Sequence, residues 1–169
     1  MTELWFFGDP HFEHESCVSV FKRHDGSPLR DFANSIEMSE HIVERINSVV
    51  NPQDHLYLMG DIAMKKQFLP WVARCNGHKR LLFGNHDIFE TDLYRRYFEK
   101  MTAYRVIDKV CFSHVPIHPA SMGRFLGNAH AHLHHVQQEL GEQYRCLSAE
   151  MLDNYTPVNL EQVKAKFGA

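Results

Sequence analysis

Short apolar runs that stop abruptly at polar residues recur along the chain. They occupy residues 4–7, 56–59, 81–83 and 110–112. Three of them stop at Gly-Asp or Gly-Asn, and the fourth stops at Ser-His. An apolar run that ends in a turn signal is typical of a buried strand followed by a loop. We therefore predict four strands, each of which presents polar side chains at its carboxyl end.

Segments with the apolar spacing of a helix lie between these predicted strands. Apolar residues at i, i+3 and i+4 predict an amphipathic helix with Ser35 or Ser39 as its N-cap. The residues with this spacing are Ile42, Val43, Ile46, Val49 and Val50. Weaker helical patterns cover 68–75 and 88–101, strand-like patterns cover 103–112 and 144–148, and a short helix is expected near 160–167. The alternation of strand and helix predicts a layered α/β (α+β) fold.

Composition narrows the class of protein. The 169 residues are 44% hydrophobic and 23% charged, which is close to the globular average and suits one domain. No apolar stretch approaches the ~20 residues of a membrane span and no secretory signal opens the chain, so we expect a cytoplasmic location. The four cysteines form no C-x-x-C pair, which argues against a zinc ribbon or a redox motif. The net charge of −3 makes duplex nucleic acid an unfavourable partner.

Histidine is unusually frequent, with 13 residues, and its positions suggest chemistry. Asp9 and His11 flank Pro10, which disfavours a helical conformation at Asp9. In an extended segment, side chains two residues apart point the same way. The pair would therefore suit one metal ion, although a lone Asp-Pro-His tripeptide is more often an ordinary turn.

The later strand ends carry further candidates. Asp61 follows Gly60, and His114 follows the last of the four runs. In the segment Asn85-His86-Asp87, Asn supplies a neutral oxygen ligand, His can transfer a proton and Asp can orient an imidazole. Each of these is a weak signal in isolation, because a turn or a helix cap would look the same.

Four histidines fall within the six residues 130–135. Alternate residues of an extended segment share a face, so His130, His132 and His134 are expected on one side. Imidazoles, carboxylates and an amide without a nearby thiolate suit Mn, Fe, Zn, Co or Ni. The candidate ligands are Asp9, His11, Asp61, Asn85, His114, His132 and His134. Seven ligands are too many for one ion but suffice for two ions that share a carboxylate.

The ordered set of motifs D-x-H, G-D, G-N-H-D, a His at a strand end and H-x-H resembles the calcineurin-like metallophosphoesterase superfamily. The resemblance spans Asp9 to His134, and residues 8–14 look like the start of its small bacterial and phage members. It implies a single calcineurin-like phosphoesterase domain over residues 1–169. The implied fold is a two-sheet β-sandwich flanked by helices, with the metal ions at one sheet edge.

The resemblance also implies roles for the candidate ligands. The first metal ion would be bound by Asp9, His11 and His134. The second would be bound by Asn85, His114 and His132. Asp61 would bridge the two ions and His86 would be the catalytic imidazole. The implied cofactors are two divalent transition-metal ions, with manganese as first choice and iron, zinc, nickel or cobalt as alternatives.

Two positions depart from the family pattern. Ala131 stands where the family has Gly before the H-x-H histidine, so both His130-x-His132 and His132-x-His134 fit. We prefer the second pair, because His130 then matches a histidine often found before that Gly. After Asp61 the chain lacks the Asp-Arg-Gly of Ser/Thr protein phosphatases, which disfavours that assignment.

The function implied is the hydrolysis of phosphate esters, small phosphodiesters or nucleotides, by a metal-activated hydroxide, with His86 assisting the leaving group. The expected partner is therefore a small phosphorylated substrate, without a membrane. The expected substrate-binding residues are His14, Arg30, Asn85, His86 and Arg124.

Two other functions compete with this hypothesis. A catalytically inactive scaffold of the same fold would have lost ligands or the catalytic histidine, yet every expected position is filled. A histidine-rich metal-storage protein would not require Asn85 or the Gly-Asp context of Asp61.

Overall fold

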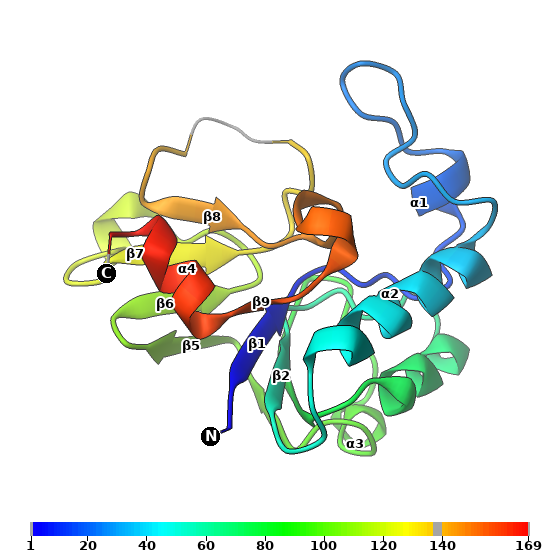
Figure 1. The fold of residues 1–169 in the computed structure, drawn as a ribbon, viewed down its shortest axis with the longest axis horizontal. Coiled ribbons are helices and arrows are strands. Elements are labelled where there is room, and N and C mark those ends of the chain that lie inside the picture. Colours follow the sequence, from blue (N-terminus) through cyan, green and yellow to red (C-terminus); the bar gives the residue numbers. More distant parts are fainter. Residues whose placement is uncertain (1, 137–139, 169) are drawn as a thin grey trace.

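The computed structural model describes residues 2–136 and 140–168, and its strands form two mixed sheets flanked by helices (Figure 1). The first sheet has the order β4-β3-β2-β1-β9. Its strands are β1 (Leu4–Phe7), β2 (His55–Leu58), β3 (His78–Leu82), β4 (Lys100–Thr102) and β9 (Val158–Asn159). Strands β1 to β4 pair in parallel and β9 runs antiparallel to β1. A mixed α/β architecture with layered sheets was predicted and is confirmed.

The second sheet has the order β5-β6-β7-β8. Its strands are β5 (Tyr104–Ile107), β6 (Val110–Ser113), β7 (Gly127–His130) and β8 (Tyr144–Cys146). Strand β5 pairs antiparallel with β6, whereas β6, β7 and β8 are parallel. All four apolar runs of the sequence lie within or overlap strands. Strand β7 was not predicted, because Gly-Asn-Ala-His lacks an apolar run.

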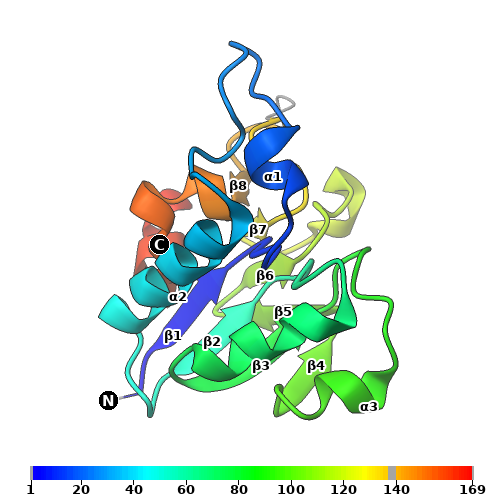
Figure 2. The same cartoon turned by 90° about the vertical axis from the view of Figure 1, so that its right-hand side faces the viewer.

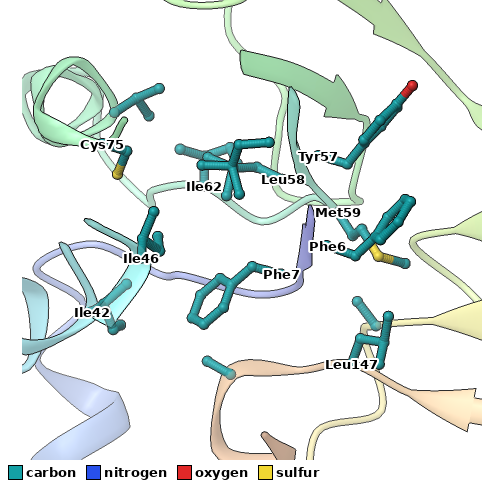
Figure 3. Close-up of a cluster of buried hydrophobic side chains, with 14 of the residues drawn as sticks. Phe6, Phe7, Ile42, Ile46, Tyr57, Leu58, Met59, Ile62, Cys75 and Leu147 are labelled. Carbon is teal, nitrogen blue, oxygen red and sulfur yellow. The ribbon is translucent and has the colours of Figure 1, made fainter. Parts of the chain in front are cut away.

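Successive side chains of β1 and β2 point to opposite faces of the first sheet, so these strands contact a layer on each side (Figure 3). Phe7 and Leu58 point toward the helices, where they meet Ile42 and other buried residues. Phe6 points the other way and stacks on Phe112 of the second sheet, with ring centroids 3.9 Å apart. The first sheet is therefore covered by helices on one face and by the second sheet on the other.

Helices cover the outer faces of this arrangement (Figure 2). The longest is α2 (Ser35–Val49), which lies beside the 3₁₀ helix of Lys66–Arg74. The others are α1 (Ser16–Ser19), α3 (Thr91–Tyr94), α4 (Leu160–Lys166) and short 3₁₀ turns at Pro119–Ser121, Ala149–Met151 and Asp153–Tyr155. Within residues 2–136 and 140–168, no helix combines the length and apolar character needed to cross a membrane.

Two helix predictions need correction. The N-cap of α2 is Asn34, whose side chain accepts hydrogen bonds from the backbone N–H of Ile36 and Glu37. Ser39 is instead buried inside the helix, where its hydroxyl donates to the Ser35 carbonyl. The helix expected over 88–101 is limited to the four residues of α3, because the chain then turns and forms β4.

The parallel strands bring distant loops to one edge. Strands β1, β2 and β3 end at the same edge of the first sheet, as do β6 and β7 in the second. The sheets are joined there by Gly8, whose N–H donates to the Leu147 carbonyl at 2.8 Å. A Cβ at Gly8 would lie 2.6 Å from the Ala131 Cβ, so only glycine fits this contact. The strand ends that carry the polar motifs therefore converge at one edge of the two sheets.

We expect Phe6→Ala to lower the free energy of unfolding by about 3–5 kcal/mol, because it removes the ring that joins the sheets. Urea denaturation of the metal-free protein measures this loss. Ile36→Ala is the control, since Ile36 is 55% exposed and should change the stability by no more than about 0.5 kcal/mol. Equal losses in the two variants would contradict the packing described here.

Candidate metal centre

The candidate ligands follow the carboxyl ends of five strands. Asp9 follows β1, Asp61 follows β2, Asn85 follows β3, His114 follows β6 and His132 follows β7. His11 and His134 lie two residues further along the first and last of these loops. The fold therefore gathers all seven candidates at one edge of the two sheets.

The Asp and His side chains form two groups, each of which could hold a metal ion. The first consists of Asp9, His11 and His134, and the second of Asp61, His114 and His132. In each group the ligand atoms all lie within 4.8 Å of one another. Asn85 adjoins the second group, with its Oδ1 at 2.9 Å from His114 Nε2.

Asp61 lies where the two groups meet. Its Oδ2 is 3.7 Å from His11 Nε2 in the first group, and its Oδ1 is 3.5 Å from His114 Nε2 in the second. Asp9 faces the second group as well, since its Oδ1 is 3.7 Å from His114 Nδ1. The two groups are thus neighbours, and the Asp61 carboxylate lies between them.

The backbone of the ligand loops is not extended, contrary to expectation. Five ligand residues adopt left-handed conformations, with φ between 47° and 68°. They are Asp9, His11, Asp61, His132 and His134. Positive φ is uncommon for residues other than glycine, and such strain gathers at functional sites. The side chains are therefore brought together by tight left-handed turns, and the alternation argued for Asp9 with His11 and for 130–134 was wrong.

His130 does not join either group. It ends strand β7, is buried, and its Nδ1 lies 2.9 Å from the Ala131 carbonyl. Its ring lies beside that of Tyr144. Of the two H-x-H pairs that fit the sequence, only His132-x-His134 directs both rings into the ligand groups.

Two glycines make room for the ligands. A Cβ at Gly60, which has φ of 85°, would lie 2.5 Å from His114 Nδ1. A Cβ at Gly84 would collide with the carboxylate of Asp61. The Gly-Asp and Gly-Asn dipeptides at the strand ends are therefore required by the close approach of the loops.

Arg30 is not available to a substrate, which corrects its assignment as a substrate-binding residue. Its side chain is fully buried and points inward. The guanidinium donates to the carbonyls of Asp9 at 2.6 Å and Pro10 at 2.9 Å, and to Glu150 Oε2 at 3.0 Å. It therefore holds the strained loop that carries the first ligands.

Glu150 completes this network and was missed by the sequence analysis, since no motif surrounds it. Its second oxygen accepts a hydrogen bond from His134 Nδ1 at 2.7 Å. A carboxylate on the second ring nitrogen is the usual partner of a metal-binding histidine. Burial raises the pKa of Glu150, but Arg30 and His134 outweigh it and lower that pKa to about 2. Burial lowers the pKa of His134, but Glu150 and Asp9 raise it overall.

The electrostatics of the centre fit divalent cations. Burial raises the pKa of Asp9 and lowers the pKa of His11 well below its usual value, the latter helped by Arg30. Within the described residues, Asp9 Oδ1 and His11 Nδ1 are buried without a hydrogen-bond partner. The lowered pKa keeps His11 in the neutral form that a metal ion requires. The raised pKa of Asp9 reflects a buried carboxyl group that a bound cation would compensate.

His114 gives a second test of this fit. Its Nδ1 lies 2.8 Å from the Met59 carbonyl, so in the neutral ring this nitrogen carries the proton. The bare Nε2 then faces Asn85 Oδ1 and Asp61 Oδ1, which also lack protons. A bare ring nitrogen that faces two oxygens at 2.9 and 3.5 Å suits a cation between them.

Asp87 supports the centre in a different way from the one predicted. It was expected to orient an imidazole, but its carboxylate accepts backbone N–H groups of Asp61, Ile62 and Gly84 at 2.8–3.0 Å. Burial nevertheless raises its pKa. Asp87 thus ties the loop after β3 to the loop that presents Asp61.

An open cavity of about 700 Å³ lies over the ligand groups. His86 is exposed and lines this cavity, and its backbone N–H donates to Asp61 Oδ1 at 2.9 Å. His14 also lines the cavity. Arg124 is exposed but is not among the lining residues, so the structure gives its assignment no support.

Comparisons with known proteins give relatives without an assigned activity. No protein-family model matches the chain. An uncharacterized protein of Methanocaldococcus jannaschii is 23% identical over 176 residues, which cover 96% of this chain and 90% of that protein. The gene 66 protein of Mycobacterium phage L5 is 30% identical over 93 residues, which cover 52% of this chain and 41% of the phage protein.

A solved structure shares the fold. The crystal structure of AQ665, a protein of unknown function from Aquifex aeolicus, aligns with a TM-score of 0.69 at 20% sequence identity. The alignment covers 98% of this chain and 99% of AQ665. At this identity the likeness establishes the shared architecture and leaves the chemistry to be argued from the site.

We expect Arg30→Met to lower the free energy of unfolding of the metal-free protein by about 3–5 kcal/mol, because Glu150 is left as a buried charge without its guanidinium partner. Adding Glu150→Gln should restore part of the loss. Lys66→Met is the control, since the Lys66–Glu90 pair is exposed and should contribute less than about 1 kcal/mol. A loss in Arg30→Met no larger than in the control would contradict the supporting role of Arg30.

Proposed function

We propose that the chain is a dinuclear metal-dependent phosphoesterase of the calcineurin-like metallophosphoesterase superfamily. The observation that carries this proposal is the pair of Asp/His groups that meet at Asp61. The ordered sequence motifs support the same assignment, and the two sheets flanked by helices agree with the architecture that the family resemblance implies.

The proposed ligands divide along the two groups. Asp9, His11 and His134 would hold one ion, and His114, His132 and Asn85 would hold the other, with Asp61 between them. When bound, two divalent cations supply Lewis-acid activation of water and neutralise the charge of a phosphate. Manganese is our first assignment, because imidazole, carboxylate and amide ligands accommodate it, and they also accommodate iron, zinc, nickel and cobalt.

We propose that His86 assists the leaving group. Hydrolysis forms one bond from a water oxygen to phosphorus and breaks the bond to an ester oxygen, which must gain a proton to leave as an alcohol. His86 is exposed at the cavity, outside both ligand groups, and its ring centroid is 6.1 Å from that of His11. A protonated His86 can donate to the ester oxygen of a phosphate held over the groups.

The cavity and the charge balance favour a small substrate. A cavity of about 700 Å³ accommodates a molecule of nucleotide size. The net charge of −3 supplies no long-range attraction for a duplex. We therefore propose small phosphodiesters or nucleotides as substrates.

We expect the purified protein to bind close to two transition-metal ions per chain, and Asp61→Asn to lose metal and activity together, because Asp61 would serve both ions. Elemental analysis by mass spectrometry and hydrolysis of a generic diester measure the two effects. Asp92→Asn is the matched control, because Asp92 is exposed and pairs with Arg95 away from the centre. Full activity with one tightly bound ion per chain would overturn the dinuclear assignment.

His86→Ala should separate catalysis from metal binding. We expect kcat to fall by about 10²–10⁴, the range for loss of a general acid or base, while the metal content stays near that of the wild type. His41→Ala provides the control, since His41 lies on α2 and contacts Asn154. An unchanged kcat in His86→Ala would remove this residue from the mechanism.

A further inference from the structure

The cavity over the metal centre has a polar floor and an apolar wall. The floor is formed by four of the candidate ligands and by His86; the four ligands are His11, Asp61, His132 and His134. The wall residues are Phe21, Leu29, Met64, Leu133 and Val136. They come from separate segments, namely the loop between α1 and α2, the loop after Asp61 and the loop that carries His132 and His134. The first of these extends away from the sheets (Figure 1).

Phe21 is the aromatic residue of this wall. Its side chain is 44% exposed, although it is large and apolar. Its ring packs on that of His14 at 5.8 Å, and His14 in turn contacts His11 at 5.3 Å between centroids. Phe21 is therefore linked through the His14 ring to His11, which is a candidate metal ligand. A contiguous apolar surface beside a few polar groups is a common feature of ligand-binding pockets.

We propose that this wall binds a ring-sized apolar ester group of the substrate, so that the preferred substrates are phosphodiesters with an aryl, benzyl or similar ring on one ester oxygen. The inference rests on the proposed function. A phosphate over the polar floor places its ester group within the same cavity, next to Phe21 and Met64. Water that covers the wall is released when the ring binds.

A ring fits this wall better than a long chain does. Phe21 offers an aromatic surface and Met64 a polarizable thioether, both of which favour contact with a ring. The cavity is about 700 Å³ in total, and its floor is already shared with the phosphate. A long alkyl chain would need a longer apolar groove. Here the exposed Lys22 and the half-buried His135 interrupt the apolar lining.

Three diesters test the preference. Each carries a trifluoroethyl leaving group, whose release is followed by ¹⁹F NMR, and a second ester group that is methyl, hexyl or benzyl. With the manganese-loaded protein, kcat/KM should be highest for the benzyl diester. The gain should be mainly in KM, because contacts with the ring are similar in the ground state and the transition state.

Variants of the wall give the second test. Phe21→Ala should lower the benzyl-to-methyl ratio of kcat/KM roughly tenfold, the order expected for one aromatic contact. Met64→Ala should lower the ratio in the same direction. Val20→Ala is the matched control, because Val20 is 62% exposed and adjacent in sequence but is not among the cavity-lining residues.

A binding measurement on the metal-free protein is independent of activity. Benzylphosphonate should shift the ¹H resonance of the Met64 methyl group more than methylphosphonate does. The methyl group of Met38, which is fully buried, is the internal reference and should not move.

The outcomes separate the two proposals. If no diester is hydrolysed with any metal, the proposed phosphoesterase function fails, and the Met64 shift still decides whether the wall binds a ring. If all three diesters are hydrolysed with equal kcat/KM and Met64 does not respond, the function stands and the ring site is overturned. A preference for hexyl over benzyl would also overturn it, in favour of a chain-binding surface.

Discussion

Two buried carboxylates at the shared edge of the sheets set the main constraint on this structure. Asp9 and Asp61 are almost fully buried among imidazoles, and Asp9 Oδ1 lacks a hydrogen-bond partner among the described residues. Burying an unpaired carboxylate is costly unless a cation neutralises it. His11, His114 and His134 lie around them and complete two groups that could hold metal ions, and the proposed function rests on this arrangement.

Keeping these carboxylates in place requires support from the backbone. Arg30 donates to the carbonyls beside the first ligands, and Asp87 accepts the N–H groups of the Asp61 loop. Both contacts act on main-chain atoms, so they stabilise left-handed turns that would otherwise be strained. Glu150 connects this scaffold to the centre, because it binds both Arg30 and His134. The residues that position the ligands are thus as buried as the ligands themselves.

The floor and the wall of the cavity would determine different parts of the substrate specificity, the phosphate and its ester group. The polar floor would select a phosphate, which is common to all substrates of the proposed reaction. The wall around Phe21 and Met64 would select among ester groups, and it comes from loops outside the two sheets. Proteins that share the architecture, such as AQ665, can therefore share a fold without sharing a substrate, because loop residues vary independently of the sheets.

The sequence by itself determined strands β1, β2, β3 and β6 and the types of candidate ligand, because these depend on local patterns: an apolar run that ends in a polar turn predicts a strand followed by a loop. Strand β7 lacks such a run, and β4 overlaps the segment that was expected to be helical. Only the tertiary structure shows that His134, and not His130, joins a ligand group. The reason is that the turns at His132 and His134 have φ above 50°, and no local sequence pattern predicts these turns. The same holds for Arg30, which was expected to face a substrate. Its partner Glu150 is 120 residues away in the chain, and the pairing exists only because both sheets close over the same edge.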